Sequence, residues 1–118
     1  MDSDFAQRFT NEWLDAWNSH DIDRILSHFH EDIVFSSPVA QRIVAESDGY
    51  VRGLDDVRSY WTEGLRRNRD LHFTLEGLYV GVDTLVINYR NQSGVRVNEV
   101  LKFNGSLVVE GHGTYEVS

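Results

Sequence analysis

Residues 95–105 read VRVNEVLKFNG, and this stretch decides the fold. Its apolar residues Val95, Val97, Leu101 and Phe103 recur at every second position, which is the period of a strand with one buried face. Asn104-Gly105 follows, and both residue types tolerate the positive φ angles of a two-residue hairpin turn. Residues 107–117 alternate again. The spacing therefore predicts two antiparallel strands joined by a tight turn.

Two more runs with the same period precede this hairpin, at residues 71–80 and 84–90. Short polar or glycine-containing connections separate them, so the four runs are typical of an antiparallel meander. Glycines within the runs favour a strongly bent sheet, because they pack no side chain and permit tight bending. These glycines are Gly77, Gly111 and Gly113.

The first half of the chain has a helical period instead. Residues 4–18 place large apolar side chains three and four positions apart, which predicts an amphipathic helix. Asp21 is the expected N-cap of a second, shorter helix that buries Ile22, Ile25, Leu26 and Phe29. A third main helix is expected from Leu54 to Leu65, with acidic residues in its first turn and arginines at its end. Short strands at 33–35 and 50–53 flank a short helix at 39–45.

Residues 1–118 are therefore expected to form one α+β domain. Three main N-terminal helices would pack on one face of a strongly curved, mostly antiparallel sheet, which forms a cone around one apolar pocket. A chain of 118 residues is long enough for one such core and too short for two.

The composition of the chain argues against several classes of function. The formal net charge is −8, which repels phosphate backbones and anionic lipid, so we expect neither nucleic-acid nor membrane binding. An acidic start and the lack of a long apolar run predict a cytoplasmic protein. There is no cysteine, and the five histidines do not form a zinc-helix pattern. We expect no metal and no cofactor.

Glu99 is the most informative residue. Strand alternation puts it in the middle of the apolar series of residues 95–103, so its carboxyl group points into the core side of the sheet. An unpaired buried carboxylate costs several kcal/mol, so the group should be protonated, paired or facing a solvated cavity. A carboxyl group held near neutrality can shuttle a proton at ordinary pH. The alternatives are a salt bridge to an arginine, or a shifted register that leaves Glu99 in solvent.

The alternation of the last predicted strand indicates a second feature of the site. If Leu107 and Val109 point inward, so do Gly111, Gly113 and Tyr115. The two glycines would then leave empty volume for a ligand beside Tyr115, or merely permit curvature. His112 would lie on the outer face with Glu110, in a sheet-face or dimer-contact role. The outer face would also carry Val86, Val100 and Val108, and this surface predicts a homodimer formed through the sheet.

Four segments carry a family resemblance. They are residues 13–23 (WLDAWNSHDID), 27–38 (SHFHEDIVFSSP), 52–61 (RGLDDVRSYW) and 99–105 (EVLKFNG) with 108–110 (VVE). Together they resemble the nuclear transport factor 2-like superfamily, and within it the SnoaL-like and ketosteroid-isomerase-like proteins. The resemblance implies a cone of helices and bent sheet around one apolar pocket, commonly as a dimer through the sheet.

The resemblance to ketosteroid isomerase mostly fails at the site itself. The family's general-base aspartate falls on Ser37, and its oxyanion-hole tyrosine falls on Trp13, whose indole donates a hydrogen bond but gives up no proton. Its oxyanion-hole aspartate falls on Glu99. One of three roles is kept, so literal steroid isomerisation is rejected.

Two functions remain open. The first is a cofactor-independent acid–base enzyme, an isomerase, cyclase, dehydratase or hydrolase acting on a small carbonyl, epoxide or polyketide-like molecule. Glu99 would transfer the proton, with Trp13 and Tyr115 as orienting donors. The second is a non-catalytic ligand-binding or dimerisation module with a degenerate site. In either case we expect a small apolar ligand, bound by Phe35, Ser37, Tyr60, Trp61, Tyr89, Val97, Gly111 and Gly113. Whether residues 38–45 cover the pocket stays open.

Overall fold

A six-stranded sheet organises the computed structural model, which describes residues 1–117. The strands lie in the order β2-β1-β6-β5-β4-β3, and neighbours are antiparallel except β1 and β6, which are parallel. The strands are β1 (Phe29–Ser36), β2 (Tyr50–Arg52), β3 (Thr74–Val80), β4 (Thr84–Arg90), β5 (Arg96–Asn104) and β6 (Leu107–Tyr115). The helices are α1 (Ser3–Asn18), α2 (Ile22–Leu26), α3 (Pro38–Ile43) and α4 (Leu54–Arg67).

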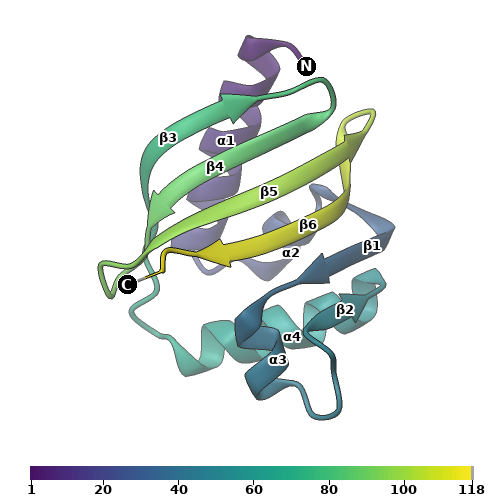
Figure 1. The fold of residues 1–118 in the computed structure, drawn as a ribbon, viewed down its shortest axis with the longest axis vertical. Coiled ribbons are helices and arrows are strands. Elements are labelled where there is room, and N and C mark those ends of the chain that lie inside the picture. Colours follow the sequence, from purple (N-terminus) through teal and green to yellow (C-terminus); the bar gives the residue numbers. More distant parts are fainter. Residues whose placement is uncertain (118) are drawn as a thin grey trace.

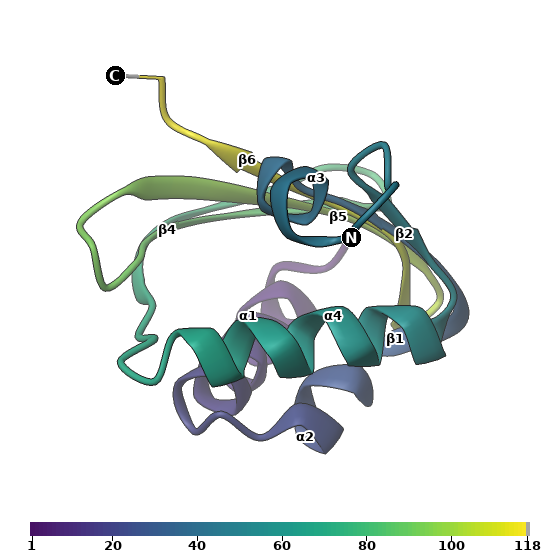
Figure 2. The ribbon, with the colours of Figure 1, turned by 90° about the horizontal axis from the view of Figure 1, so that it is seen from below.

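The helices gather on one side of a bent sheet. In Figure 1 the long strands β3 to β6 cross in front of α1, and α4 runs below them. Figure 2 shows the sheet arching over α1 and α4 while its far edges stay apart, so it does not close into a barrel. The expected α+β fold class is confirmed. Among residues 1–117 no helix combines the length and apolar character that crossing a bilayer requires.

The aromatic stripe of α1 forms the centre of the core, as its spacing predicts. Phe9, Trp13 and Trp17 are buried, and Ala6 and Ala16 on the same helix are fully buried. Asp2 caps the helix by accepting a hydrogen bond from the Asp4 amide over 2.6 Å. Each large apolar side chain buried in this way contributes roughly 1.5–3 kcal/mol to the free energy of unfolding.

A β-bulge in β6 corrects one prediction about the outer face. Lys102 pairs with Glu110, but its neighbour Phe103 pairs with Val108, so Val109 is the extra residue. The bulge reverses the alternation at this point and turns Val108 into the core, where it is fully buried. Val108 was expected on the outer face of the sheet, and that expectation is wrong. Strict alternation has no means of anticipating an inserted residue.

Strand β3 begins at Thr74 and not at Leu71 as the alternation predicts, because a side chain replaces a strand partner here. The Phe73 amide donates to Asn18 Oδ1 over 2.7 Å, and Asn18 Nδ2 donates to the Phe73 carbonyl over 3.0 Å. The Leu71 carbonyl is bonded to the ring of His20 at 2.9 Å. The end of α1 is therefore tied directly to the entrance of β3.

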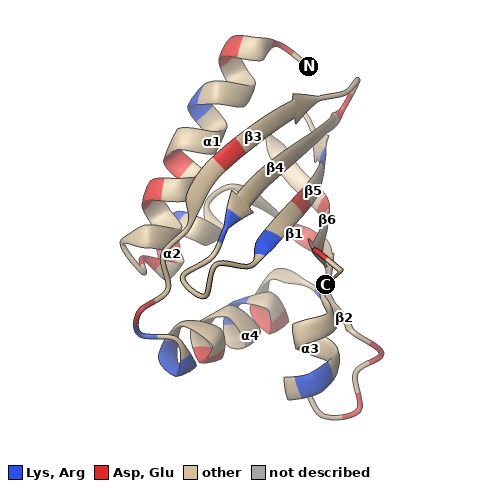
Figure 3. Ribbon diagram, turned by 60° about the vertical axis from the view of Figure 1, so that its left-hand side comes forward, with Lys and Arg blue, Asp and Glu red and all other residues tan. Residues whose placement is uncertain are grey.

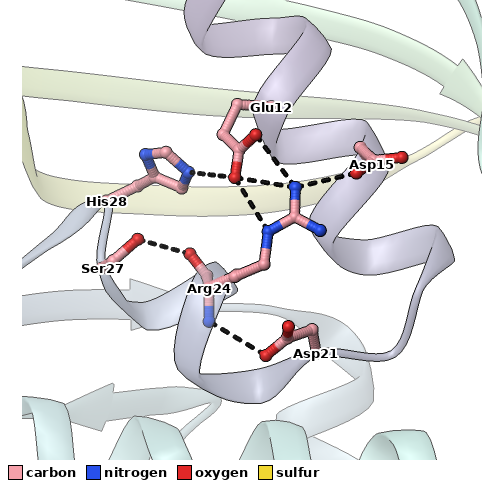
Figure 4. A network of polar contacts seen from close by, with 6 residues as sticks. All are labelled: Glu12, Asp15, Asp21, Arg24, Ser27 and His28. Carbon is pink, nitrogen blue, oxygen red and sulfur yellow. Dashed lines mark hydrogen bonds and ion pairs between the residues drawn. The ribbon is translucent and has the colours of Figure 1, made fainter.

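An arginine joins α1 to α2. Charged residues lie on the exposed turns of α1 and α4 (Figure 3), and Figure 4 shows one cluster at close range. The Arg24 guanidinium donates to Glu12 Oε1 over 2.8 Å and to Asp15 Oδ2 over 2.7 Å. Asp21 caps α2 through the Arg24 amide, as its position predicts. His28 lies beside Glu12, half-buried against the ring of Phe9.

Candidate functional site

A cavity of about 430 Å³ lies between the helices and the inner face of the sheet, and we call it the inner cavity. Its volume falls in the range of pockets that hold small molecules. Its walls come from α1, α3, α4, β1, β4, β5 and β6, together with the segment at residues 68–73 and the turn at residues 91–95. Nine of its 21 lining residues are aromatic, namely Trp13, Trp17, Phe29, Phe35, Tyr60, Trp61, Phe73, Tyr89 and Tyr115.

Glu99 is the only carboxylic acid that lines the inner cavity within residues 1–117. Its side chain is 8% exposed, and the predicted inward orientation is correct. The Tyr89 hydroxyl donates to Glu99 Oε1 over 2.9 Å. Burial raises the pKa of Glu99 to about 7, although the Tyr89 hydrogen bond and the charge of His112 lower it in part. Near neutral pH the carboxyl group is therefore populated in both protonation states.

Gly113 packs beside this carboxyl group. It lies opposite Glu99 in the β5–β6 pair, and a Cβ atom at Gly113 would stand 3.5 Å from Glu99 Oε1 and 3.6 Å from Ser37 Oγ. Ser37 is the N-cap of α3, and its Oγ accepts from the Val39 amide over 3.1 Å. The start of α3 thus holds a hydroxyl group close to the acid.

Three tyrosines surround the acid, and all three remain protonated at neutral pH. Burial raises the pKa of Tyr60 to about 12, and it raises the pKa of Tyr89 and Tyr115 above the ordinary value of 10. Ser37 is in polar contact with Tyr60 and Tyr115, which partly offsets the effect of burial on their pKa. Protonated phenols are hydrogen-bond donors, so this end of the inner cavity can bind an oxygen atom that gains negative charge.

The structure brings most of the predicted site residues together. Glu99, Trp13, Tyr115, Phe35, Tyr60, Trp61 and Tyr89 line the inner cavity, and Ser37 lies immediately behind Glu99. Trp13 packs against Phe73 and Tyr89, with ring centroids 5.7 and 5.6 Å away.

Val97, Gly111 and Gly113 lie behind the cavity wall instead of on it. Val97 is 1% exposed in the core. A Cβ atom on Gly111 would stand 3.2 Å from Leu101 Cδ2 and 3.3 Å from Phe35 Cδ1. The space above this glycine is therefore filled, and the expectation that the glycines leave empty volume for a ligand needs correction. They let Phe35, Glu99 and Ser37 pack closely against β6.

Sequence reasoning missed several wall residues that lie outside the long strands. Arg42 reaches the inner cavity from α3, and Phe73 reaches it from the segment before β3. Asn91 and Gln92 reach it from the turn between β4 and β5. The helix-to-strand change near residue 73 is visible in the sequence, but nothing in the alternation shows which side this segment faces.

A second hollow lies outside this site. It is an open groove of about 850 Å³ between α3, β2 and α4, and it carries Glu46, Asp48, Asp56 and Glu63 beside Arg52. It is larger than the inner cavity but does not include Glu99, so the chemistry described above belongs to the smaller space. Within residues 1–117, no group of three or more histidine or acidic side chains is arranged to hold a metal ion.

Comparison with known proteins agrees with this architecture. The sequence profile of the SnoaL-like domain matches residues 10–117. A SnoaL-like protein of unknown function from Burkholderia thailandensis E264 is 41% identical over 99% of both chains, with a TM-score of 0.93. No curated protein matches the chain.

More distant solved structures share the fold alone. A protein from Sinorhizobium meliloti, provisionally named a polyketide cyclase, has a TM-score of 0.73 at 13% identity over 89% of this chain and 92% of its own. An NTF2-like protein of unknown function from Cytophaga hutchinsonii has a TM-score of 0.73 at 10% identity, over 94% and 89% of the two chains.

Proposed function

The chain belongs to the SnoaL-like family, and on this premise we propose that it is a cofactor-independent acid–base catalyst acting on a small, largely apolar carbonyl compound. The observation that carries the proposal is Glu99, a single acid in an aromatic cavity with a pKa of about 7. A general base is most effective when its pKa lies near the working pH. Epoxide and polyketide-like substrates fit the same chemistry, and the provisional name of the Sinorhizobium protein points to the latter.

We propose a proton transfer that uses the groups at this end of the inner cavity. Ionised Glu99 removes a proton from the carbon next to the substrate carbonyl, and the C–H electron pair becomes the C=C bond of an enolate. Tyr60 and Tyr115 donate hydrogen bonds to the enolate oxygen. Protonated Glu99 then returns the proton to another carbon or to the same one. One positioned acid–base group accelerates such a step by roughly 10²–10⁴-fold.

Deuterium exchange tests this step without knowledge of the natural substrate. The α-protons of 1-tetralone exchange in D₂O once a base removes them, and NMR follows their loss. We expect the protein to accelerate exchange and the Glu99→Gln variant to lose the acceleration. The matched control is Glu31→Gln, which removes an exposed carboxyl group from β1. Equal rates for the wild type and Glu99→Gln would refute the proposal.

A non-catalytic ligand-binding module is the alternative, and one observation favours it. Within residues 1–117 the inner cavity has a single carboxyl group and no histidine, so a second group to relay the proton is lacking. Under this alternative, Glu99→Gln would bind 1-tetralone as the wild type does, and neither protein would accelerate exchange.

A further inference from the structure

The charge of the inner cavity differs from that of the whole chain. The chain carries a formal net charge of −8, but the charged groups that line the cavity are Arg42, Arg67 and Glu99. Glu99 is substantially protonated at neutral pH because burial raises its pKa to about 7. Arg42 and Arg67 are exposed residues that line the same cavity as this partly neutral acid. In a chain with an excess of negative charge, the lining of the cavity therefore carries more positive than negative charge.

The two arginines are not equivalent. Arg67 Nε donates to Glu63 Oε1 over 2.7 Å, and this carboxylate balances its charge. Arg42 has no carboxylate within ion-pair distance in the described part of the chain. The unmatched positive charge of the cavity therefore comes from Arg42 on α3.

The charge of Arg42 influences the end of the inner cavity that contains Tyr60, Tyr115 and Glu99. Its charge lowers the pKa of Tyr60 and Tyr115 in part, so the guanidinium lies within electrostatic range of both phenols. Its backbone is well fixed, because Ser37 caps α3, Ala40 is fully buried and Ser47 Oγ donates to the Ala40 carbonyl over 3.1 Å. Basic residues on α3 and at the end of α4 are visible in Figure 3.

We propose that the ligand of the inner cavity is an aromatic carboxylate whose anionic group binds Arg42 while its carbonyl or hydroxyl end meets Glu99. This inference rests on the proposed function and names its substrate class. Aromatic walls select a flat apolar body, and a guanidinium group binds a carboxylate through two parallel hydrogen bonds. One unmatched arginine suits one negative charge, which favours a carboxylate over a phosphate ester.

Matched pairs of acids and amides test the proposal by binding alone. The probes are benzoate, 2-naphthoate and anthracene-2-carboxylate, each beside its neutral amide. Trp13, Trp17 and Trp61 line the cavity, so their fluorescence reports occupancy. At pH 7 we expect at least one acid to bind roughly tenfold or more tightly than its amide. A hydrogen bond between charged groups is stronger than one to a neutral amide.

Two arginine variants complete the experiment. Arg42→Gln should reduce the preference for the acid to about onefold, while Arg8→Gln on the exposed face of α1 makes the same change in net charge and should keep it. The inference is overturned if no acid is preferred over its amide, if no acid binds, or if Arg42→Gln keeps the preference. A preference that depends on Arg42, together with tetralone exchange that ignores Glu99, would retain this inference and reject the proposed catalysis. Tetralone exchange that depends on Glu99, together with a preference for the acid that does not depend on Arg42, would retain the proposed catalysis and reject this inference.

Discussion

Tyr89 and Glu99 are diagonal neighbours on the inner face of the sheet, and the Tyr89 hydroxyl donates to Glu99 Oε1 over 2.9 Å. Tyr89 pairs with Val97 across the β4–β5 ladder, so its ring lies one step along the face from the acid. The hydrogen bond stabilises the ionised carboxylate in a place where burial opposes ionisation. The pKa of Glu99 is the balance between burial, which raises it, and the Tyr89 hydrogen bond and the charge of His112, which lower it.

Removing this hydrogen bond should shift the balance. We expect Tyr89→Phe to raise the pKa of Glu99 further above 7, because the bond favours the charged form and burial remains. Carboxyl carbon shifts measured by NMR against pH give the value directly. Tyr79→Phe, which changes an exposed ring on the outer face, is the matched control. A Glu99 pKa that falls in Tyr89→Phe would contradict the assignment.

Glu99 should also make stability depend on pH. Its pKa is about 7 in the folded chain and ordinarily 4.5, so between these values the folded state binds more protons than the unfolded state. The free energy of unfolding therefore falls as pH rises through this interval, by about 3 kcal/mol in total. Glu99→Gln keeps an acceptor for Tyr89 but cannot ionise. Urea unfolding should find this variant more stable than the wild type at pH 8 and similar to it at pH 4.

His28 should change the pH dependence of stability in the direction opposite to that of Glu99. Burial lowers the pKa of His28 below its ordinary value of 6.5, although Glu12 raises it in part. As the pH falls below 6.5, His28 binds a proton in the unfolded chain more readily than in the folded chain. The free energy of unfolding therefore decreases. We expect His28→Gln to weaken the fall in unfolding free energy between pH 7 and pH 5. The exposed His72→Gln variant is the control, and an equal effect in both would refute the prediction.

Two glycines of β6 should respond differently to alanine. A Cβ atom at Gly111 meets Leu101 at 3.2 Å and Phe35 at 3.3 Å, so Gly111→Ala should lower the free energy of unfolding by about 1–3 kcal/mol through overpacking. At Gly113 the nearest contact is an ordinary 3.5 Å, and Gly113→Ala should be close to neutral. Chemical denaturation of both variants compares them directly. The reverse order of stabilities would show that the packing above Gly111 is misread.

We propose that the outer face of the sheet pairs two copies of the chain. Tyr79, Val86 and Val100 occupy consecutive strands in one row, which continues through His112 to Ser36. Tyr79 is 63% exposed, and an apolar row on an open sheet face favours association. Light scattering at micromolar concentration should give twice the 13.6 kDa of one chain. Val100→Asp should halve that mass, and a monomeric wild type would refute the proposal.

The sequence was sufficient to predict the helices, the meander and the orientation of Glu99, because each depends on a simple period. Trp13 and Tyr60 follow a helical repeat, and Glu99 follows strand alternation. The sequence was insufficient where tertiary contacts override the periodicity of a helix or strand. The bulge at Val109 reverses the face of Val108, and the side chain of Asn18 replaces a strand partner for Phe73. Arg42 was missed because a six-residue helix has too few turns to reveal which face is inward.

The strand order has a consequence for how the protein is made. β6 is the strand of this sheet that is synthesised last, and it inserts between β1 and β5 and supplies partners to both. Without β6, the pairs β1–β2 and β3–β5 would be separate ladders with unpaired edges. Such edges favour aggregation, so we expect the complete sheet to form only after residues 107–115 have been translated. A premature stop codon before residue 107 would leave two fragments of sheet with nothing to unite them.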